Sequence, residues 1–325
     1  MRPAIALIAT SLLFAASDAS AAWSAGGKFV ESPGDINGLR YARFYDLPSG
    51  DLGVLGVGIS FAVNYSRVQR ISRNGDIAPG WPADGVRFDP LLAGAQIRDQ
   101  DWVVSDSGDV WRAWDGGSAS AEFASASGSL VPQSAPFTFH VTGGIGRAAA
   151  APNGDMFVAF GADQLTRITR AGTISPEWPA DGVGLFSTSY EDCALMPDGT
   201  GGVLVFMRRA PNVPRVWRID RDGSFHPGWP DLVIGSAAST GTIPGWNDSQ
   251  LLPSGPDHVI AAWSAGTNSG VRKLTLQRFG LDGTLDPAWP PAGLQVFAAD
   301  TLVALTLVPD GIGRASCRER VYGPV

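Results

Sequence analysis

Three aspartates are the candidates for ligand binding in this sequence of 325 residues. Asp101, Asp192 and Asp248 each lie four or five residues before a turn that leads into an apolar segment. Carboxylates bind cations and accept hydrogen bonds from polar ligands, so the three together would form an acidic rim. The alternative is that all three are solvated loop residues, which is the usual environment of aspartate. The choice depends on whether the fold brings them to one face.

A calcium loop is a second candidate, because Asp220 and Asp222 precede Gly223 in IDRDG. Calcium-binding loops begin with oxygen ligands at alternate positions. An aligned segment of the chain carries Ser72 and Asn74 at these positions, so the carboxylates are not retained. An Asn, Asp or Gly before glycine is what a hairpin turn requires, and we therefore predict a turn.

The sequence predicts no catalytic residue, no metal ligand and no cofactor. It contains no G-x-S-x-G, H-E-x-x-H or C-x-x-C motif, and His140, His226 and His258 share no ligand spacing. Two glycine-rich segments lack the strand and helix that a dinucleotide-binding turn needs. Cys193 has no histidine near it in the repeat described next, so we expect a small buried residue.

An internal repeat organises the chain. Its frame is R-h-x-x-x-G-x-h-x-P-x-W-P, where h is an apolar residue. The copies are RISRNGDIAPGWPADGVRF (70–88), RITRAGTISPEWPADGVGLF (167–186), RIDRDGSFHPGWPDLVI (218–234) and QRFGLDGTLDPAWPPAGLQVF (277–297). A degenerate copy, GSLVPQS (128–134), has Ser134 in place of Trp. The turn glycines of the five copies lie at positions 75, 128, 172, 223 and 283.

A second glycine turn lies in the other half of each unit and is followed by an apolar run. It occurs in LPSGDLGVLGV (47–57), VSDSGDVWRAW (104–114), APNGDMFVAF (151–160), MPDGTGGVLVF (196–206), LPSGPDHVIAAW (252–263) and VPDG (308–311). Glycine supplies the positive φ of a hairpin turn, and proline ends a strand because it cannot donate to the ladder. Each unit therefore holds about four short strands.

A period of about 45–60 residues with four strands per unit predicts an all-β fold, a β-propeller of four-stranded blades. Residues 22–311 would form about five blades and the start of another, so we expect a propeller that is incomplete at the C-terminus. WSAGGKF (23–29) has the W-x-x-x-G spacing of WPADGVRF, as expected of an N-terminal strand that completes the last blade. An open β-solenoid is the alternative, although solenoid coils usually have shorter periods.

The repeat resembles two families of secreted bacterial proteins. RFGLDGTLDPAWPPAGLQVF (278–297) is similar to the delta-60 repeat, of the form R-h-x-x-D-G-x-x-D-x-x-h-G-x-x-G, but has W-P where phenylalanine and glycine are usual. The second turn segments resemble the P-D-G-x-G-G repeats of large bacterial surface proteins. The resemblance covers most of residues 23–311. It implies a secreted, propeller-like protein and no particular activity, since such repeats serve many roles.

Two side chains recur at fixed positions of the repeat. Arg70, Arg167, Arg218 and Arg278 could form a ring that binds an anion, and the repeated Trp could be a platform for a sugar. A residue kept in every unit more often solves one packing problem repeatedly. We therefore expect each Arg to form an ion pair or to stack on a neighbouring Trp, and each Trp to lie in the core between blades.

Residues 1–21 are predicted to be a secretory signal peptide, with Arg2, an apolar stretch at 4–16 and the small-x-small sequence at 19–21. The apolar stretch is too short to span a bilayer, so we predict no membrane insertion. A formal net charge of −7 without a basic cluster offers no surface for nucleic acid. We expect a secreted monomer, extracellular or periplasmic.

The C-terminal residues 312–325 interrupt the repeat. An apolar strand is due after LTLVPDG (305–311), but IGRASCRERV (312–321) follows. This decapeptide resembles the translation of a common short-read sequencing adapter, so we expect residues 312–325 to be a non-native tail. Under this interpretation Cys317 and the arginines around it have no function.

These observations favour a non-catalytic binding or surface-display module whose ligand is an extracellular protein or glycan. Function in repeat folds lies in the loops that the repeats do not share. The alternative is an enzyme that acts on polysaccharide through carboxylates at the mouth of a central channel. That chemistry needs two carboxylates about 5–9 Å apart.

Overall fold

The computed structural model describes residues 39–46, 51–59, 64–88, 100–105, 107–115, 119–125, 127–128, 137–139, 145–160, 164–185, 190–209, 213–235, 249–265, 272–299, 304–309 and 315–320. The predicted signal peptide, the WSAGGKF segment, Ser134 and Asp248 lie outside these residues. The described residues are strands and turns, with one short 3₁₀ turn, η1 (Pro152–Gly154), which confirms the predicted all-β fold. No helix in this part of the chain is long and apolar enough to cross a membrane.

The described strands form five four-stranded antiparallel sheets, each built in chain order, and one two-stranded sheet. Sheet 1 contains β1 (Leu39–Asp46), β2 (Leu52–Ile59), β3 (Asn64–Ile71) and β4 (Val86–Phe88). Sheet 2 contains β5 (Gln100–Val104), β6 (Val110–Asp115), β7 (Ala119–Ala124) and β8 (Phe137–Phe139). Sheet 3 contains β9 (Ile145–Ala150), β10 (Met156–Phe160), β11 (Gln164–Ile168) and β12 (Val183–Gly184).

The later sheets repeat the same order of strands. Sheet 4 contains β13 (Tyr190–Pro197), β14 (Val203–Arg209), β15 (Val213–Ile219) and β16 (Leu232–Val233). Sheet 5 contains β17 (Gln250–Pro253), β18 (His258–Ala265), β19 (Arg272–Gly280) and β20 (Leu294–Ala299). The two-stranded sheet contains β21 (Ala304–Pro309) and β22 (Ala315–Arg320). β22 lies in the segment predicted to be non-native, and it pairs with β21 along its whole length.

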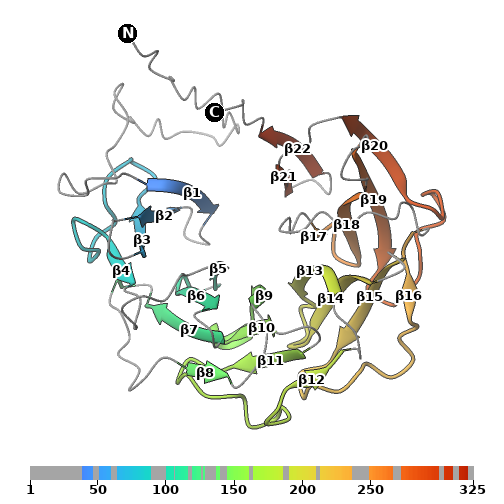
Figure 1. Cartoon of the computed structure of the whole chain (residues 1–325), viewed down its shortest axis with the longest axis horizontal. Coiled ribbons are helices and arrows are strands. Elements are labelled where there is room, and N and C mark those ends of the chain that lie inside the picture. The colour runs from blue at the N-terminus through green and yellow to red at the C-terminus, as the bar shows by residue number, and fades with distance from the viewer. Residues whose placement is uncertain are drawn as a thin grey trace.

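The sheets follow one another around a central space in chain order (Figure 1). The first strands β5, β9, β13 and β17 lie nearest the centre, and the fourth strands β8, β12, β16 and β20 lie at the periphery. Neighbouring first strands of sheets 2 to 5 contact each other. Sheet 1 and the two-stranded sheet stand at the two ends of the arc (Figure 1).

Both sets of glycine turns have the predicted conformation where they are described. After the third strands, φ is between 75° and 82° at Gly75, Gly128, Gly172, Gly223 and Gly283. Between the first and second strands, φ is between 78° and 83° at Gly108, Gly154, Gly199 and Gly255. The loop after the third strand also forms one equivalent bridge in four sheets, Ile71–Ile77, Ile168–Ile174, Ile219–Phe225 and Phe279–Leu285. The repeat in the sequence is therefore a repeat in the backbone.

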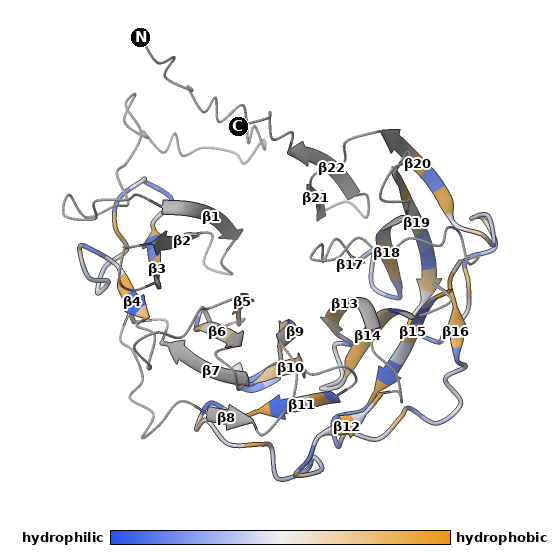
Figure 2. Ribbon diagram, viewed as in Figure 1, coloured by the Kyte–Doolittle hydropathy of each residue, from blue (hydrophilic) through white to orange (hydrophobic). Residues whose placement is uncertain are grey.

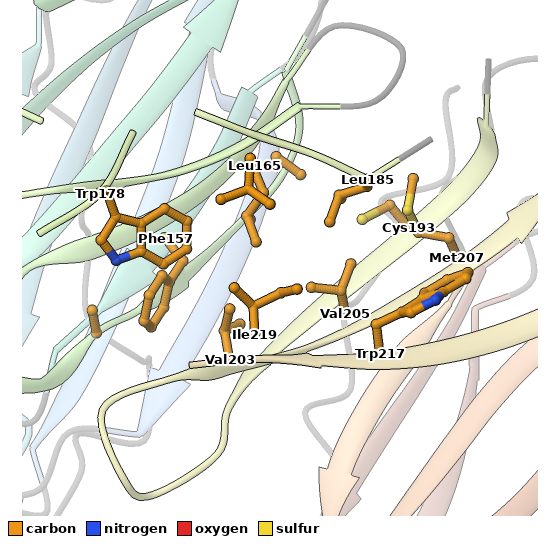
Figure 3. Packing of buried hydrophobic residues seen from close by; sticks show 13 residues of the cluster. Phe157, Leu165, Trp178, Leu185, Cys193, Val203, Val205, Met207, Trp217 and Ile219 are labelled. Atoms are coloured by element: carbon orange, nitrogen blue, oxygen red, sulfur yellow. The ribbon is translucent and has the colours of Figure 1, made fainter. Parts of the chain in front are cut away.

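The hydrophobic core is divided among the interfaces between neighbouring sheets. Between sheets 3 and 4, Phe157, Leu165 and Trp178 pack with Val205 and Met207 (Figure 3). Similar clusters join sheets 1 and 2, sheets 2 and 3, and sheets 4 and 5. β10 is buried along its whole length because it lies within sheet 3 and has a neighbouring sheet on each face. Along β11, β15 and β20, polar residues interrupt the apolar ones (Figure 2).

Candidate functional site

Two of the three predicted rim aspartates lie on first strands, near the beginning of each strand. Asp101 in β5 is opposite Ala113, and Asp192 in β13 is opposite Arg208. These strands line the centre of the arc (Figure 1). Asp248 lies outside the described residues and immediately precedes the described part of sheet 5. The strand positions of Asp101 and Asp192 agree with a site at one end of the central space.

The strand register shows that Asp101 and Asp192 do not share one level. The ladder pair next to the connection between first and second strands is Val104–Val110 in sheet 2, Pro197–Val203 in sheet 4 and Pro253–Val259 in sheet 5. Asp101 lies three residues before this point, whereas Asp192 and Asp248 lie five residues before it. Because a strand rises about 3.4 Å per residue, Asp101 is about 7 Å nearer the turn.

The turn glycine does not mark a fixed level of the sheets. Five residues connect the two members of the ladder pair next to this turn in every four-stranded sheet, but the glycine of this connection changes place. Gly108 and Gly154 are fourth in the connection, whereas Gly199 and Gly255 are second. A residue at a given distance before this glycine is therefore two residues nearer the turn in sheets 2 and 3 than in sheets 4 and 5. The shift preserves the side of the strand, since side chains alternate with a period of two.

A basic residue lies at the level of Asp101. Arg147 in β9 is three residues before Ala150, the last residue of its strand. Its Nε donates a hydrogen bond to the carbonyl oxygen of Cys193 in β13, at 3.1 Å, and so joins two first strands. The region around the first-strand beginnings is therefore of mixed charge, which sequence analysis missed because Arg147 follows no repeat motif. Cys193 itself is fully buried, as predicted.

The repeated arginines form ion pairs, as predicted, at the other end of the sheets. The third strand ends beside the connection between first and second strands, so each Arg meets an Asp of that connection in sheets 1, 3 and 4. The pairs are Arg70–Asp51 at 2.7 Å, Arg167–Asp155 at 2.9 Å and Arg218–Asp198 at 2.9 Å. In sheet 5 Arg278 pairs with Asp286, in the loop after the third strand, at 2.8 Å. Each of these four guanidinium groups is paired with a carboxylate of its own sheet, and an anion-binding ring is not needed to explain them.

Asp198 shows how such a carboxylate is held. It is buried, which raises its pKa, but hydrogen bonds from Thr200 and Arg218 outweigh the burial, so its pKa lies below the ordinary value. Thr200 donates through its backbone N at 2.8 Å and its Oγ1 at 2.7 Å, and Gly202 N donates at 2.9 Å. Arg218 also reaches the next sheet, because its Nη1 donates to the carbonyl oxygen of Leu281 at 3.2 Å.

Trp81, Trp178 and Trp229 lie between sheets, as predicted. Trp81 and Trp178 are 7% and 5% exposed, and the Nε1 of Trp178 donates to the carbonyl oxygen of Arg221 in sheet 4 at 2.7 Å. The turn glycine of the following sheet lies against the Trp-Pro pair. A Cβ atom at Gly223 would lie 3.2 Å from Trp178 Cδ2, and one at Gly128 would lie 3.1 Å from Trp81 Cδ2. The aromatic faces are therefore used for packing.

The suspected calcium loop is a turn, in agreement with the prediction. Asp222 Oδ1 accepts hydrogen bonds from the backbone N of Ser224 at 2.9 Å and from its Oγ at 2.6 Å. These bonds lower the pKa of Asp222. Asp220 lies 2.8 Å from His226 Nδ1. Within the described residues, no group of three or more His, Cys, Asp and Glu side chains is placed to share a metal ion.

Sheet 2 departs from the repeat and contains two charged groups that sequence analysis missed. Its third strand carries Phe123 where the other sheets carry the repeated Arg. Asp109, whose side chain is 1% exposed, pairs instead with Arg170 of sheet 3 at 2.8 Å. Arg112 is fully buried in the middle of β6 and lies opposite Glu122 across the ladder. The sequence does indicate that Asp109 needs a partner from elsewhere, because it follows a turn glycine in a unit that lacks the repeated Arg.

No protein-family model matches this chain, and no curated protein matches it. Among solved structures it is similar to SapL1 lectin in complex with alpha methyl fucoside, with 12% identity over 88% of this chain and 91% of the lectin and a TM-score of 0.48. It is also similar to the major Malassezia sympodialis allergen Mala s 1, with 11% identity over 87% and 84% of the two chains and a TM-score of 0.42. A protein of unknown function from Bacteroides caccae has 17% identity and a TM-score of 0.35. That match covers 56% of this chain and 64% of the other, less than two thirds of its length.

Proposed function

We propose that the protein is a secreted β-propeller that binds an extracellular protein or glycan and performs no catalysis. Sheets 1 to 5 are its blades, and β21 begins another. The observation that carries this proposal is that the repeated Arg and Trp side chains are occupied in packing and ion pairs. The residues left for function are those that the repeats do not share, at the beginnings of the first strands.

The charge at this end of the central space supports a polar ligand. Asp101 and Asp192 lie on the first strands of sheets 2 and 4, and Arg147 lies on the first strand of sheet 3. Such a mixture offers both acceptors and donors, as hydroxyl-rich or peptide ligands require. The repeated Arg–Asp pairs lie at the opposite end of the sheets, and their role is to stabilise the individual blades.

Array binding with matched variants tests the proposal. The purified chain is applied to glycan and extracellular-protein arrays beside a variant with Asp101→Asn, Asp192→Asn and Asp248→Asn. A control variant carries Asp84→Asn and Asp181→Asn, two exposed aspartates in the Trp-Pro loops at the other end of the sheets. We expect the wild type and the control to bind a common ligand and the first variant to lose it. Equal binding by both variants would refute the assignment of the site.

A turnover assay separates binding from catalysis. The array ligand is incubated with the wild type, and the release of new ends or fragments is followed over hours. The proposal predicts stable binding without release. Release that a single Asp→Asn change abolishes would replace the proposal with the polysaccharide-cleaving enzyme.

A further inference from the structure

The turn between β5 and β6 contains a buried carboxylate in a sheet that lacks the repeated Arg. Asp109 directly precedes the second strand of sheet 2, as Asp155 directly precedes the second strand of sheet 3. Asp155 pairs with Arg167 of its own third strand. Phe123 occupies the position of Arg167 in sheet 2, since each of them lies five residues before a turn glycine. The third strand of sheet 2 therefore offers Asp109 no cation.

Arg170 of sheet 3 supplies this cation. Its Nη2 lies 2.8 Å from Asp109 Oδ2, and the side chain of Asp109 is 1% exposed. A Cβ atom at Gly154 would lie 2.7 Å from Arg170 Cδ and 3.1 Å from Asp109 Oδ2, so the pair lies next to the turn between β9 and β10. The Nε1 of Trp111, which is fully buried, donates to the carbonyl oxygen of Gly154 at 2.9 Å. An ion pair and a hydrogen bond therefore hold sheet 2 to one turn of sheet 3.

The same position of the repeat reaches the preceding sheet from sheet 4, but this contact lies at the surface. Arg170 and Arg221 each lie three residues after the repeated Arg of their sheet. The Nη2 of Arg221 lies 2.7 Å from Glu177 Oε1 of sheet 3, and the two side chains are 67% and 44% exposed. Exposed ion pairs contribute little to stability, whereas loss of one partner of a buried pair leaves an uncompensated charge. The Asp109–Arg170 pair therefore couples its two sheets more strongly than the Arg221–Glu177 pair.

We infer that the Asp109–Arg170 pair is a latch that holds sheet 2 closed against sheet 3. Without Arg170, the buried Asp109 carboxylate loses its cation and gains by reaching water. Sheet 2 then opens locally at a lower free-energy cost than in the wild type. Sheet 3 keeps its own Arg167–Asp155 pair, so the loss of Arg170 affects sheet 2 more than the sheet that carries Arg170.

The latch also concerns the strands of the proposed ligand site. Asp101 lies on β5 of sheet 2 and Arg147 on β9 of sheet 3, and these two first strands contact each other. Opening of sheet 2 separates the two strands. The latch therefore keeps Asp101 and Arg147 in a fixed relation from the opposite end of the sheets, and it can be tested without a ligand.

Hydrogen exchange of the full chain, followed by mass spectrometry, tests the latch. The change Arg170→Gln removes the cation, and we expect the amides of β5, β6 and β7 to exchange at least about tenfold faster than in the wild type. The amides of β10 and β11 should change less. The matched control, Arg221→Gln, removes the cation at the same position of the repeat and should change exchange less than about twofold in every sheet. Unchanged exchange in sheet 2, an equal rise in all sheets, or an equal rise in the control would overturn the proposal.

A cation placed within sheet 2 provides a second test. Phe123→Arg gives the third strand the repeated Arg, at the ladder position from which Arg167 reaches Asp155. In this background Arg170→Gln should change exchange in sheet 2 less than about twofold, because Asp109 then has a cation in its own sheet. An effect of Arg170→Gln that stays as large in this background as in the wild type would contradict the latch.

Discussion

Replacement of Arg218 by Met tests the role assigned to the repeated arginines. Met keeps much of the side-chain length and removes the charge. The Asp198 side chain is 0% exposed and that of Arg218 is 14% exposed, so the pair is largely shielded from water. The guanidinium also donates to Thr200 Oγ1 at 3.1 Å and to the Leu281 carbonyl at 3.2 Å. The change therefore weakens both sheet 4 and its contact with sheet 5.

The size of the stability loss depends on the hydrogen bonds that the Asp198 carboxylate keeps in the variant. Loss of one partner of a buried ion pair costs about 3–5 kcal/mol. Asp198 keeps its hydrogen bonds from Thr200 and Gly202, so we expect the lower end, about 3 kcal/mol. Asp198→Ala leaves Arg218 able to reach water and should cost about 2 kcal/mol. The double variant should lose about 3 kcal/mol, which is less than the sum of the single changes because the two residues act as a pair.

Thermal and urea unfolding measure these differences. In a chain of this size a loss of about 3 kcal/mol corresponds to a decrease in Tm of about 6–12 °C. Native-state hydrogen exchange across β14 and β15 localises the effect if unfolding is not two-state. A change below about 0.5 kcal/mol in Arg218→Met, or additive losses in the double variant, would refute the packing role.

Three further predictions use matched positions. Gly223→Ala should lower the free energy of unfolding by at least about 1 kcal/mol more than Gly199→Ala, because both glycines have positive φ but only the first faces a Trp-Pro pair; urea titration measures both. Trp178→Phe should cost about 1 kcal/mol more than Trp289→Phe, because only Trp178 loses a hydrogen bond, and equal Tm shifts would contradict this. The pKa of Asp198 is lower in the folded state than in the unfolded state, so the ionised carboxylate stabilises the fold at pH values above the unfolded pKa of about 3.9. This contribution is lost as the pH falls through the folded pKa. The stability difference between the wild type and Asp198→Asn should therefore shrink below about pH 4, and a difference independent of pH from 3 to 7 would exclude the ion pair as its source.

The strands and turns could be predicted because they depend on local chemistry. The glycine at each hairpin turn and the apolar runs between turns are read directly from the sequence, and the backbone has them where predicted. The role of the repeated Trp could also be predicted, since one residue kept in every unit contacts its neighbours in the same way. Trp178 confirms this by packing against the Gly223 turn of the next sheet.

The levels of the rim residues and the non-local ion pairs could not be predicted. Asp101 and Asp192 each lie seven residues before a turn glycine, but the connection accepts its glycine at either of two positions. The partner of Asp109 is Arg170, 61 residues away on the next sheet, and no local pattern specifies it. Arg147 was missed for the same reason, since its contact with the neighbouring first strand depends on how the sheets lie side by side.

The most direct test of the account compares binding and stability in the same two variants. The central claim is that residues shared by the repeats build the sheets, whereas Asp101, Asp192 and Asp248 bind the ligand. Affinity for the array ligand and Tm are measured for the triple Asp→Asn variant and for Arg218→Met, with the folded state maintained during binding. The account predicts that the triple variant loses affinity at an unchanged Tm and that Arg218→Met loses Tm at an unchanged affinity. A triple variant that loses Tm but keeps its affinity, together with an Arg218→Met variant that loses affinity but keeps its Tm, would contradict it.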